Sequence, residues 1–205
     1  MLEISLTLFI FLWWVLKYLL INNVILKNFT MATELYRIKL RLKKLTGILG
    51  GLLFFLPLVL MFIDGTIRPS ISDYAYMVHS EWFVSMVSIA GTVFIMDGSF
   101  WNKRWYNIIL GCSLIGVSLT PHLFSPFVST IHYIFAAIFF VGSIIVMVIF
   151  SSAKQRLKKI LMALVILGAL FLHFVFNLFS LFWAEWIGML PIVIHFLGEA
   201  FEKLD

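Results

Sequence analysis

Long apolar runs, separated by short polar stretches, make up most of the chain. Two examples are LTLFIFLWWVLKYLLI at 6–21 and FAAIFFVGSIIVMVIF at 135–150, where apolar residues follow one another almost without interruption. A helix needs about 20 mainly apolar residues to cross a bilayer, whereas strands of a membrane barrel alternate apolar and polar residues. The pattern therefore predicts membrane-spanning helices. We place about seven, near residues 4–26, 46–66, 81–97, 105–121, 130–150, 160–183 and 186–201.

Composition supports this assignment. Hydrophobic residues make up 62% of the chain and charged residues 12%, whereas a soluble domain is about half apolar and a quarter charged. A lipid-exposed backbone has to satisfy its own hydrogen bonds, which continuous apolar runs do as helices. We expect an all-α, multi-pass transmembrane helical bundle that forms a single integral membrane domain over residues 1–205.

Lysine and arginine positions predict the orientation. All of them except Lys17 and Arg68 lie on alternate connections between the predicted spans or after the last span. Because cytoplasmic connections carry the excess of basic residues, we expect an external N-terminus, a cytoplasmic C-terminus and a location in a cytoplasmic (inner) membrane. The net charge of +5 is then a topology signal, and no nucleic-acid partner is expected.

The longest basic connection, residues 28–45, is open to two interpretations. Apolar residues recur there at helical spacing among lysines and arginines, at Leu35, Ile38, Leu42 and Leu45. Such a segment is typical of an amphipathic helix that lies on an anionic membrane surface. It is equally consistent with a neighbouring helix that simply continues into solvent.

Polar residues on the predicted outer connections form a first candidate site. The connection from Asp64 to Glu81 carries Asp73, His79 and Glu81, and the next outer connection supplies His122 and His132. Glu185 lies in the last outer turn. Histidine and carboxylate side chains bind metals or transfer protons. The alternative is that acidic residues gather outside because lysine and arginine are retained inside.

A second candidate site lies inside the predicted membrane region, where ionisable side chains are costly and often functional. His173 and His195 fall at matched depths on two adjacent antiparallel spans, with Asn177 one turn from the first and Glu199 one turn from the second. Asp97 reaches a depth similar to that of Glu199. His173, His195 and Glu199 could bind zinc, ligate haem or relay protons. Alternatively, the polar groups only hydrogen-bond across a helix interface.

Three segments carry a resemblance to a family of small polytopic bacterial membrane proteins of unknown function. They are PSISDYAY at 69–76, GVSLTPH at 116–122 and IHYIFAAIFF at 131–140. The resemblance spans roughly residues 65–200 and implies a helical membrane fold without soluble domains.

A more distant similarity is to the alkaline ceramidase and progestin-receptor-like superfamily of seven-helix membrane proteins. Its members place a serine, an aspartate and three histidines around zinc, and two of these histidines form HxxxH near the C-terminus. In this chain the corresponding segment reads HFLGE, so Glu199 stands where the second histidine would be, and Asp97 and His79 would replace the remaining residues.

Two functional hypotheses follow. In the first, the protein has no enzymatic activity and binds membrane lipids, a membrane protein subunit or a second copy of itself. In the second, it is a metal-dependent hydrolase of lipid amides or esters, with His173, His195 and Glu199 as metal ligands or general base.

Overall fold

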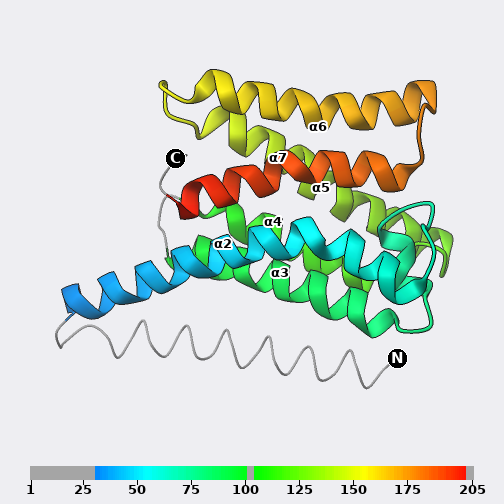
Figure 1. Cartoon of the computed structure of the whole chain (residues 1–205), viewed down its shortest axis with the longest axis horizontal. Helices are drawn as coiled ribbons and strands as arrows, with labels where there is room; N and C mark the ends of the chain where they lie inside the picture. The colour runs from blue at the N-terminus through cyan, green and yellow to red at the C-terminus, as the bar shows by residue number, and fades with distance from the viewer. Residues whose placement is uncertain (1–30, 101–103, 202–205) are drawn as a thin grey trace. The chain divides into compact units, whose positions relative to one another are not determined.

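The computed structural model describes residues 31–100 and 104–201, which fall into two units that divide between Arg41 and Leu42 (Figure 1). The described part of the first unit is the beginning of helix α2. The second unit contains the rest of α2 and all other elements. In chain order the elements are α2 (Met31–Asp64), the 3₁₀-helix η1 (Ser72–Tyr76), α3 (Ser80–Phe100), α4 (Tyr106–Leu119), α5 (Pro126–Ile149), α6 (Arg156–Phe176) and α7 (Leu181–Ala200).

All regular structure in the described residues is helical, which confirms the all-α class. Five helices are long and apolar enough to cross a membrane, and α4, with 14 residues, is shorter. The predicted span 4–26 lies outside the described residues. The count of about seven spans and the orientation of the two termini therefore stay predictions.

Local backbone signals move several boundaries away from the predicted ones. α6 ends at Phe176 because Asn177 takes a left-handed conformation (φ 49°) and donates its backbone N–H to the His173 carbonyl, so the predicted extension to 183 is wrong. α7 consequently begins at Leu181 rather than 186. α5 begins at Pro126, four residues earlier than predicted, because the Ser125 side chain caps it by accepting from the Val128 N–H.

The described part of the basic connection is helical. Residues 31–45 belong to α2, which continues to Asp64 as a single helix. Both interpretations of this segment predict a helix here, so the choice between a surface helix and a continuation into solvent stays a prediction.

α7 occupies the centre of the second unit. Half of its residues are buried, against 22% for α6. Gly50 of α2 packs against Leu197, Phe94 of α3 stacks edge-on against Phe196 with ring centroids 4.5 Å apart, and Phe140 of α5 lies next to Gly188. α6 packs along α7 as its antiparallel neighbour. Side chains on α7 are therefore placed to meet groups from most other helices.

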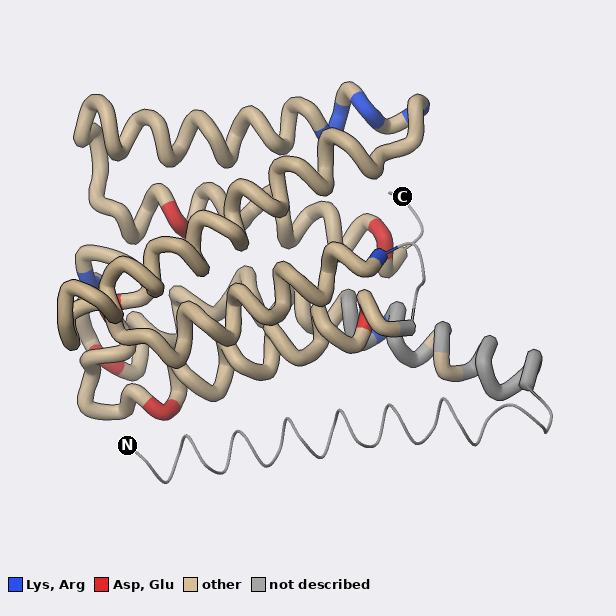
Figure 2. The backbone as a smooth tube through the Cα atoms, turned by 180° about the vertical axis from the view of Figure 1, so that it is seen from behind, with Lys and Arg blue, Asp and Glu red and all other residues tan. Residues whose placement is uncertain are grey.

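The two ends of the second unit differ in charge (Figure 2). At one end, α2 enters the unit and α4 and α6 begin. This end carries Lys44, Arg104 and the basic cluster at 154–159, and we call it the basic end. At the opposite end, residues 65–79 connect α2 to α3 and contain η1; we call this the capped end. Arg68 is the only described lysine or arginine there.

Candidate functional site

The connection 65–79 is a folded cap rather than an open loop. It leaves α2 through Gly65, whose positive φ of 75° suits glycine. Arg68 then donates from Nε and Nη2 to the two carboxylate oxygens of Asp64, at 2.7 and 2.8 Å, and this pairing raises the pKa of Arg68. Tyr74 is fully buried and donates its hydroxyl to the Thr66 carbonyl at 2.9 Å. These bonds fix the shape of the cap.

The cap is attached to the first turn of α7. The Phe182 N–H donates to the Pro69 carbonyl at 2.7 Å, and the Ile71 N–H donates to Glu185 Oε2 at 2.6 Å. Tyr74 and Phe182 also pack edge-on, with ring centroids 6.3 Å apart. Residues that are distant in the sequence thus hold η1 over the centre of the bundle.

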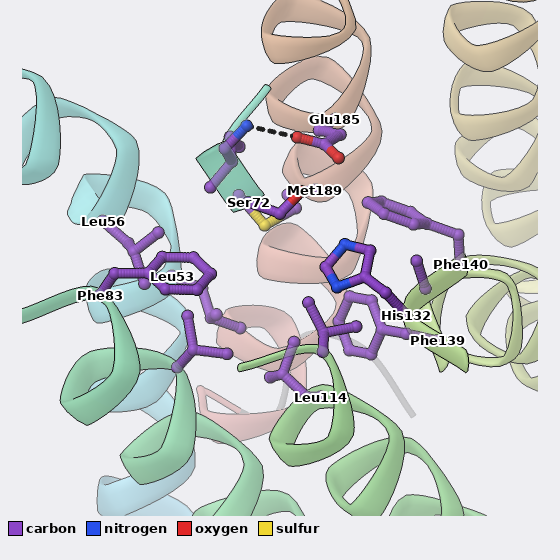
Figure 3. Close-up of a pocket in the computed structure, with 14 residues that line it drawn as sticks. Leu53, Leu56, Ser72, Phe83, Leu114, His132, Phe139, Phe140, Glu185 and Met189 are labelled. Atoms are coloured by element: carbon purple, nitrogen blue, oxygen red, sulfur yellow. Dashed lines mark hydrogen bonds between the residues drawn. The ribbon is translucent and has the colours of Figure 1, made fainter. Parts of the chain in front are cut away.

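Beneath the cap lies a cavity of about 60 Å³ (Figure 3). That volume is several times the roughly 10–15 Å³ that one water molecule requires. Its walls come from α2, η1, α3, α4, α5 and α7, and most of the lining side chains are apolar. The lining residues are Leu53, Leu56, Ile71, Ser72, Phe83, Val87, Leu114, Val117, His132, Ala136, Phe139, Phe140, Glu185 and Met189.

The polar lining residues gather at one end of the cavity. Ser72 belongs to the cap, Glu185 to the first turns of α7 and His132 to the second turn of α5. Deeper positions on the same two helices are apolar, with Met189 one turn below Glu185 and Phe139 two turns below His132. The cavity is thus polar next to the capped end and apolar toward the middle of the bundle.

A hydrogen bond to the backbone orients His132. Its side chain is buried, and Nδ1 lies 2.7 Å from the Thr120 carbonyl. A carbonyl oxygen can only accept, so Nδ1 carries the proton and Nε2 of the neutral ring keeps its lone pair.

His132 also belongs to a cluster that links the cap to the α4–α5 connection. Its ring lies 5.2 Å from that of His122, and His122 Nε2 lies 3.2 Å from Asp73 Oδ1. His122 Nδ1 is buried and has no hydrogen-bond partner among the described residues. The Tyr76 ring packs edge-on against the ring of His122. The Tyr76 hydroxyl accepts a hydrogen bond from the Leu123 N–H, and burial raises the pKa of this hydroxyl. The contacts among Asp73, Tyr76 and His122 hold the two connections together.

A separate charged cluster lies at the basic end. Arg104 Nη1 is 2.8 Å from Glu199 Oε2 and 3.5 Å from Asp97 Oδ2. His195 Nε2 is 3.4 Å from Glu199 Oε1, and Asn107 donates to Asp97 Oδ2 at 2.7 Å. The two carboxylates are buried, so one guanidinium joins α3, the start of α4 and the end of α7 through paired charges.

A comparison with known protein families identifies the family of this chain. The model of a family of unknown function, DUF7103, matches residues 55–200. The chain belongs to this family. No curated protein and no solved structure matches it. The match confirms the resemblance to a family of unknown function, whereas neither the similarity to the ceramidase superfamily nor a bacterial origin finds support in these comparisons.

The region that matches DUF7103 contains the cap and both polar clusters. It also contains every lining residue of the cavity except Leu53. The part of the chain before residue 55 thus adds one lining residue to the candidate site.

The structure brings together some of the residues predicted from sequence. On the outer connections it joins Asp73, His122 and His132, whereas His79 and Glu81 form an exposed pair 3.2 Å apart with side chains 61% and 57% accessible. At the basic end it joins the predicted residues Asp97, His195 and Glu199. Whether any of these groups has a catalytic or binding role stays a prediction.

His173 and Asn177 are not brought to His195. His173 lies three residues before the end of α6, where its Nδ1 donates to the Phe179 carbonyl at 2.8 Å, and Asn177 is the residue that ends the helix. His195 lies 14 residues after the start of α7, so the two histidines are separated by about 16 Å along the helix axes at about 1.5 Å per residue. No group of three or more histidine, cysteine, aspartate or glutamate side chains could hold a metal within the described residues. The proposed ligand set His173, His195 and Glu199 is therefore not assembled.

Sequence reasoning did not select four residues that the site uses. Ser72 and Tyr76 lie in the cap, and Asn107 and Arg104 belong to the cluster at the basic end. Arg104 entered the sequence argument only as a topology signal. Asn107 is a polar residue at the start of an apolar run, and this position could have indicated a buried polar contact.

Proposed function

We propose that this protein is a multi-pass membrane protein that binds a lipid-like amphiphile in the cavity beneath the cap. The observation that carries the proposal is the polarity gradient of the cavity. Its polar residues lie next to the capped end of the bundle and its apolar residues lie one to two helical turns deeper. A lipid in a bilayer has the same arrangement, with a head at the interface and a chain that points inward.

The cavity has the composition expected of a small-molecule site. Such sites are mainly apolar and place a few polar groups where they orient the ligand. Leu53, Leu114, Phe139 and Met189 provide an apolar wall, and Ser72, His132 and Glu185 provide the polar groups. The partly exposed residues Ala136 and Phe140 mark the side of the cavity nearest to the surface of the helical bundle. A ligand would enter the cavity from the surrounding lipid on that side.

The test uses photolabelling of the full-length protein in neutral detergent. The probes are long-chain amphiphiles that carry a diazirine near the chain end, and mass spectrometry identifies the labelled peptides. We expect labels on α5 and α7 at the peptides that contain Phe139 and Met189. Because Ala136 lines the cavity, Ala136→Phe should fill it and remove these labels.

The adjacent residue provides a matched control. Ala137 is exposed on the outer face of α5, so Ala137→Phe adds the same ring without reaching the cavity and should leave the labelling unchanged. Equal labelling of Phe139 and Met189 in wild type and Ala136→Phe would refute the proposal. Labels found only at exposed positions such as Ile145, on the outer face of α5, would refute it as well.

A further inference from the structure

Helix α4 is too short to cross a bilayer, although the helices on either side of it are long enough. Its 14 residues extend about 21 Å at about 1.5 Å per residue, whereas the hydrocarbon layer is about 30 Å thick. α3 and α5, which α4 contacts on its two sides, have 21 and 24 residues. One end of α4 therefore lies inside the thickness that α3 and α5 cross.

Contacts between the helices show that α4 falls short at the capped end. Ser118 shares a hydrogen bond with Ser88, which lies eight residues after the start of α3, and α4 ends one residue after Ser118. α3 thus continues about 12 Å past this level. On the other side, His132 binds the Thr120 carbonyl six residues after the start of α5, so α5 continues about 9 Å further. The α4–α5 connection, residues 120–125, consequently runs beside the first turns of both helices.

This connection differs in composition from the cap at the same end. Between Arg104 and Lys154 the chain contains no lysine, arginine, aspartate or glutamate, whereas the cap contains both an arginine and an aspartate. Leu123 and Phe124 in the connection and Phe127 just after it are 69%, 70% and 73% accessible. Exposing such large apolar side chains to water is costly. The uncharged, apolar surface of the connection suits lipid acyl chains.

The backbone of the connection obtains hydrogen bonds from the protein. The Leu123 N–H donates to the Tyr76 hydroxyl of the cap, and the Phe124 N–H donates to the Pro121 carbonyl at 3.2 Å. Lipid offers no hydrogen-bond partner, so non-helical backbone at membrane depth is tolerated only where other groups satisfy it. These bonds meet that requirement for the two residues of the connection whose side chains are most exposed.

We propose that the α4–α5 connection is embedded in the lipid leaflet at the capped end and that its partner is the acyl chains of that leaflet. Leu123, Phe124 and Phe127 contact the chains, and the largely buried contact between Asp73 and His122 lies on the protein side of the connection. The headgroup layer should dip toward α4 at this point. This inference uses the membrane-spanning part of the proposed function and does not depend on a ligand in the cavity.

The experiment measures the depth of the connection in full-length protein reconstituted into phosphatidylcholine vesicles. Cys112→Ser removes the single cysteine of the chain, and Phe124→Cys then provides one site for a nitroxide spin label. Oxygen concentrates in the hydrocarbon layer and a neutral nickel chelate in water, so the ratio of their effects on the relaxation of the label reports depth. Leu123→Cys repeats the measurement at a second position, and gel filtration checks that each variant is folded.

Two exposed residues provide the references. Val78 is 91% accessible in the cap, beside the exposed pair of His79 and Glu81, so Val78→Cys reports water. Ile134 is 52% accessible on α5, eight residues after the start of that helix, so Ile134→Cys reports lipid. We expect the oxygen-to-nickel ratio at Phe124 to be several times that at Val78 and to approach that at Ile134.

The outcomes separate this inference from the proposed function. A ratio at Phe124 equal to that at Val78 would overturn the inference and leave the cavity untouched. A label at Phe124 that neither oxygen nor nickel reaches would overturn it as well, because a protein partner would then cover the connection. If Ile134 also reports water, membrane spanning itself fails, and the proposed function fails together with this inference.

Discussion

The contact between α3 and α4 offers the sharpest test of the packing. At Gly91 the two antiparallel helices approach backbone to backbone, and a Cβ placed there would lie 2.7 Å from the Gly111 carbonyl oxygen and 2.6 Å from Ile115 Cγ1. Small residues allow such close approach of membrane helices. The substitution Gly91→Ala therefore has to push α4 away from α3.

The structure indicates how large the effect is. An ordinary contact begins near 3.4 Å, so the helices have to separate by about 0.7 Å (3.4 − 2.7) at this point. The hydrogen bond between Ser88 and Ser118, one turn away, would lengthen from 3.1 Å to about 3.8 Å and break. Overpacking costs about 1–3 kcal/mol, and an interhelical hydrogen bond in a membrane protein contributes about 0.6 kcal/mol. We expect Gly91→Ala to lower the free energy of unfolding by about 2–3 kcal/mol.

The assay is thermal unfolding of purified protein in one detergent at a fixed heating rate, followed by tryptophan fluorescence. For a chain of this size the loss corresponds to a decrease in Tm of about 4–12 °C. Gly168→Ala is the control, because a Cβ at that position in α6 meets no atom within 4 Å. The control should have an unchanged or higher Tm, since alanine is the better helix former. Equal Tm values for wild type and Gly91→Ala would refute the close contact between α3 and α4.

Three further predictions concern the charged cluster, the cap and the topology. Arg104→Ala removes the guanidinium that two buried carboxylates share and should cost about 3 kcal/mol of unfolding free energy, partly restored by Asp97→Asn with Glu199→Gln. Tyr74→Phe should cost about 1 kcal/mol in a chemical unfolding assay, because the bond to the Thr66 carbonyl is lost. Burial raises the pKa of Tyr74 above its usual 10.0, so the wild-type advantage should persist below pH 10 and disappear as the pH rises through the folded value. Reporter fusions after residues 44 and 104 should be cytoplasmic and those after 72 and 125 external; an external signal from residues 154–159 would contradict this topology.

The apolar pattern was sufficient to predict the α-helices of the described residues but not where each one ends. Hydropathy continues unchanged through the end of α6, and only the left-handed conformation of Asn177 stops that helix at Phe176. The supposed match in depth between His173 and His195 depended on that missing boundary. An error of a few residues in a helix end becomes a large displacement when two antiparallel helices are compared.

Neighbours within one helix were easier to predict than neighbours across the bundle. Helical spacing correctly placed Glu199 beside His195, at 3.4 Å. The contact of Asp73 with His122 depends on how two separate connections fold over the helix ends. Periodicity carries no information about such folding, since it describes one element at a time.

The attachment of the cap has a consequence for the order of biogenesis. The Ile71 N–H and Glu185 are 114 positions apart in the chain, and the Phe182 N–H and Pro69 are similarly distant. During synthesis the cap is complete long before its anchor on α7 emerges, so the cavity can close only after the last described helix has inserted. A nascent chain arrested after residue 178 should therefore be cleaved by an added protease within 65–79, whereas the released full-length protein should resist cleavage there. Completion of the chain, rather than insertion of each helix, then decides when the interior is sealed.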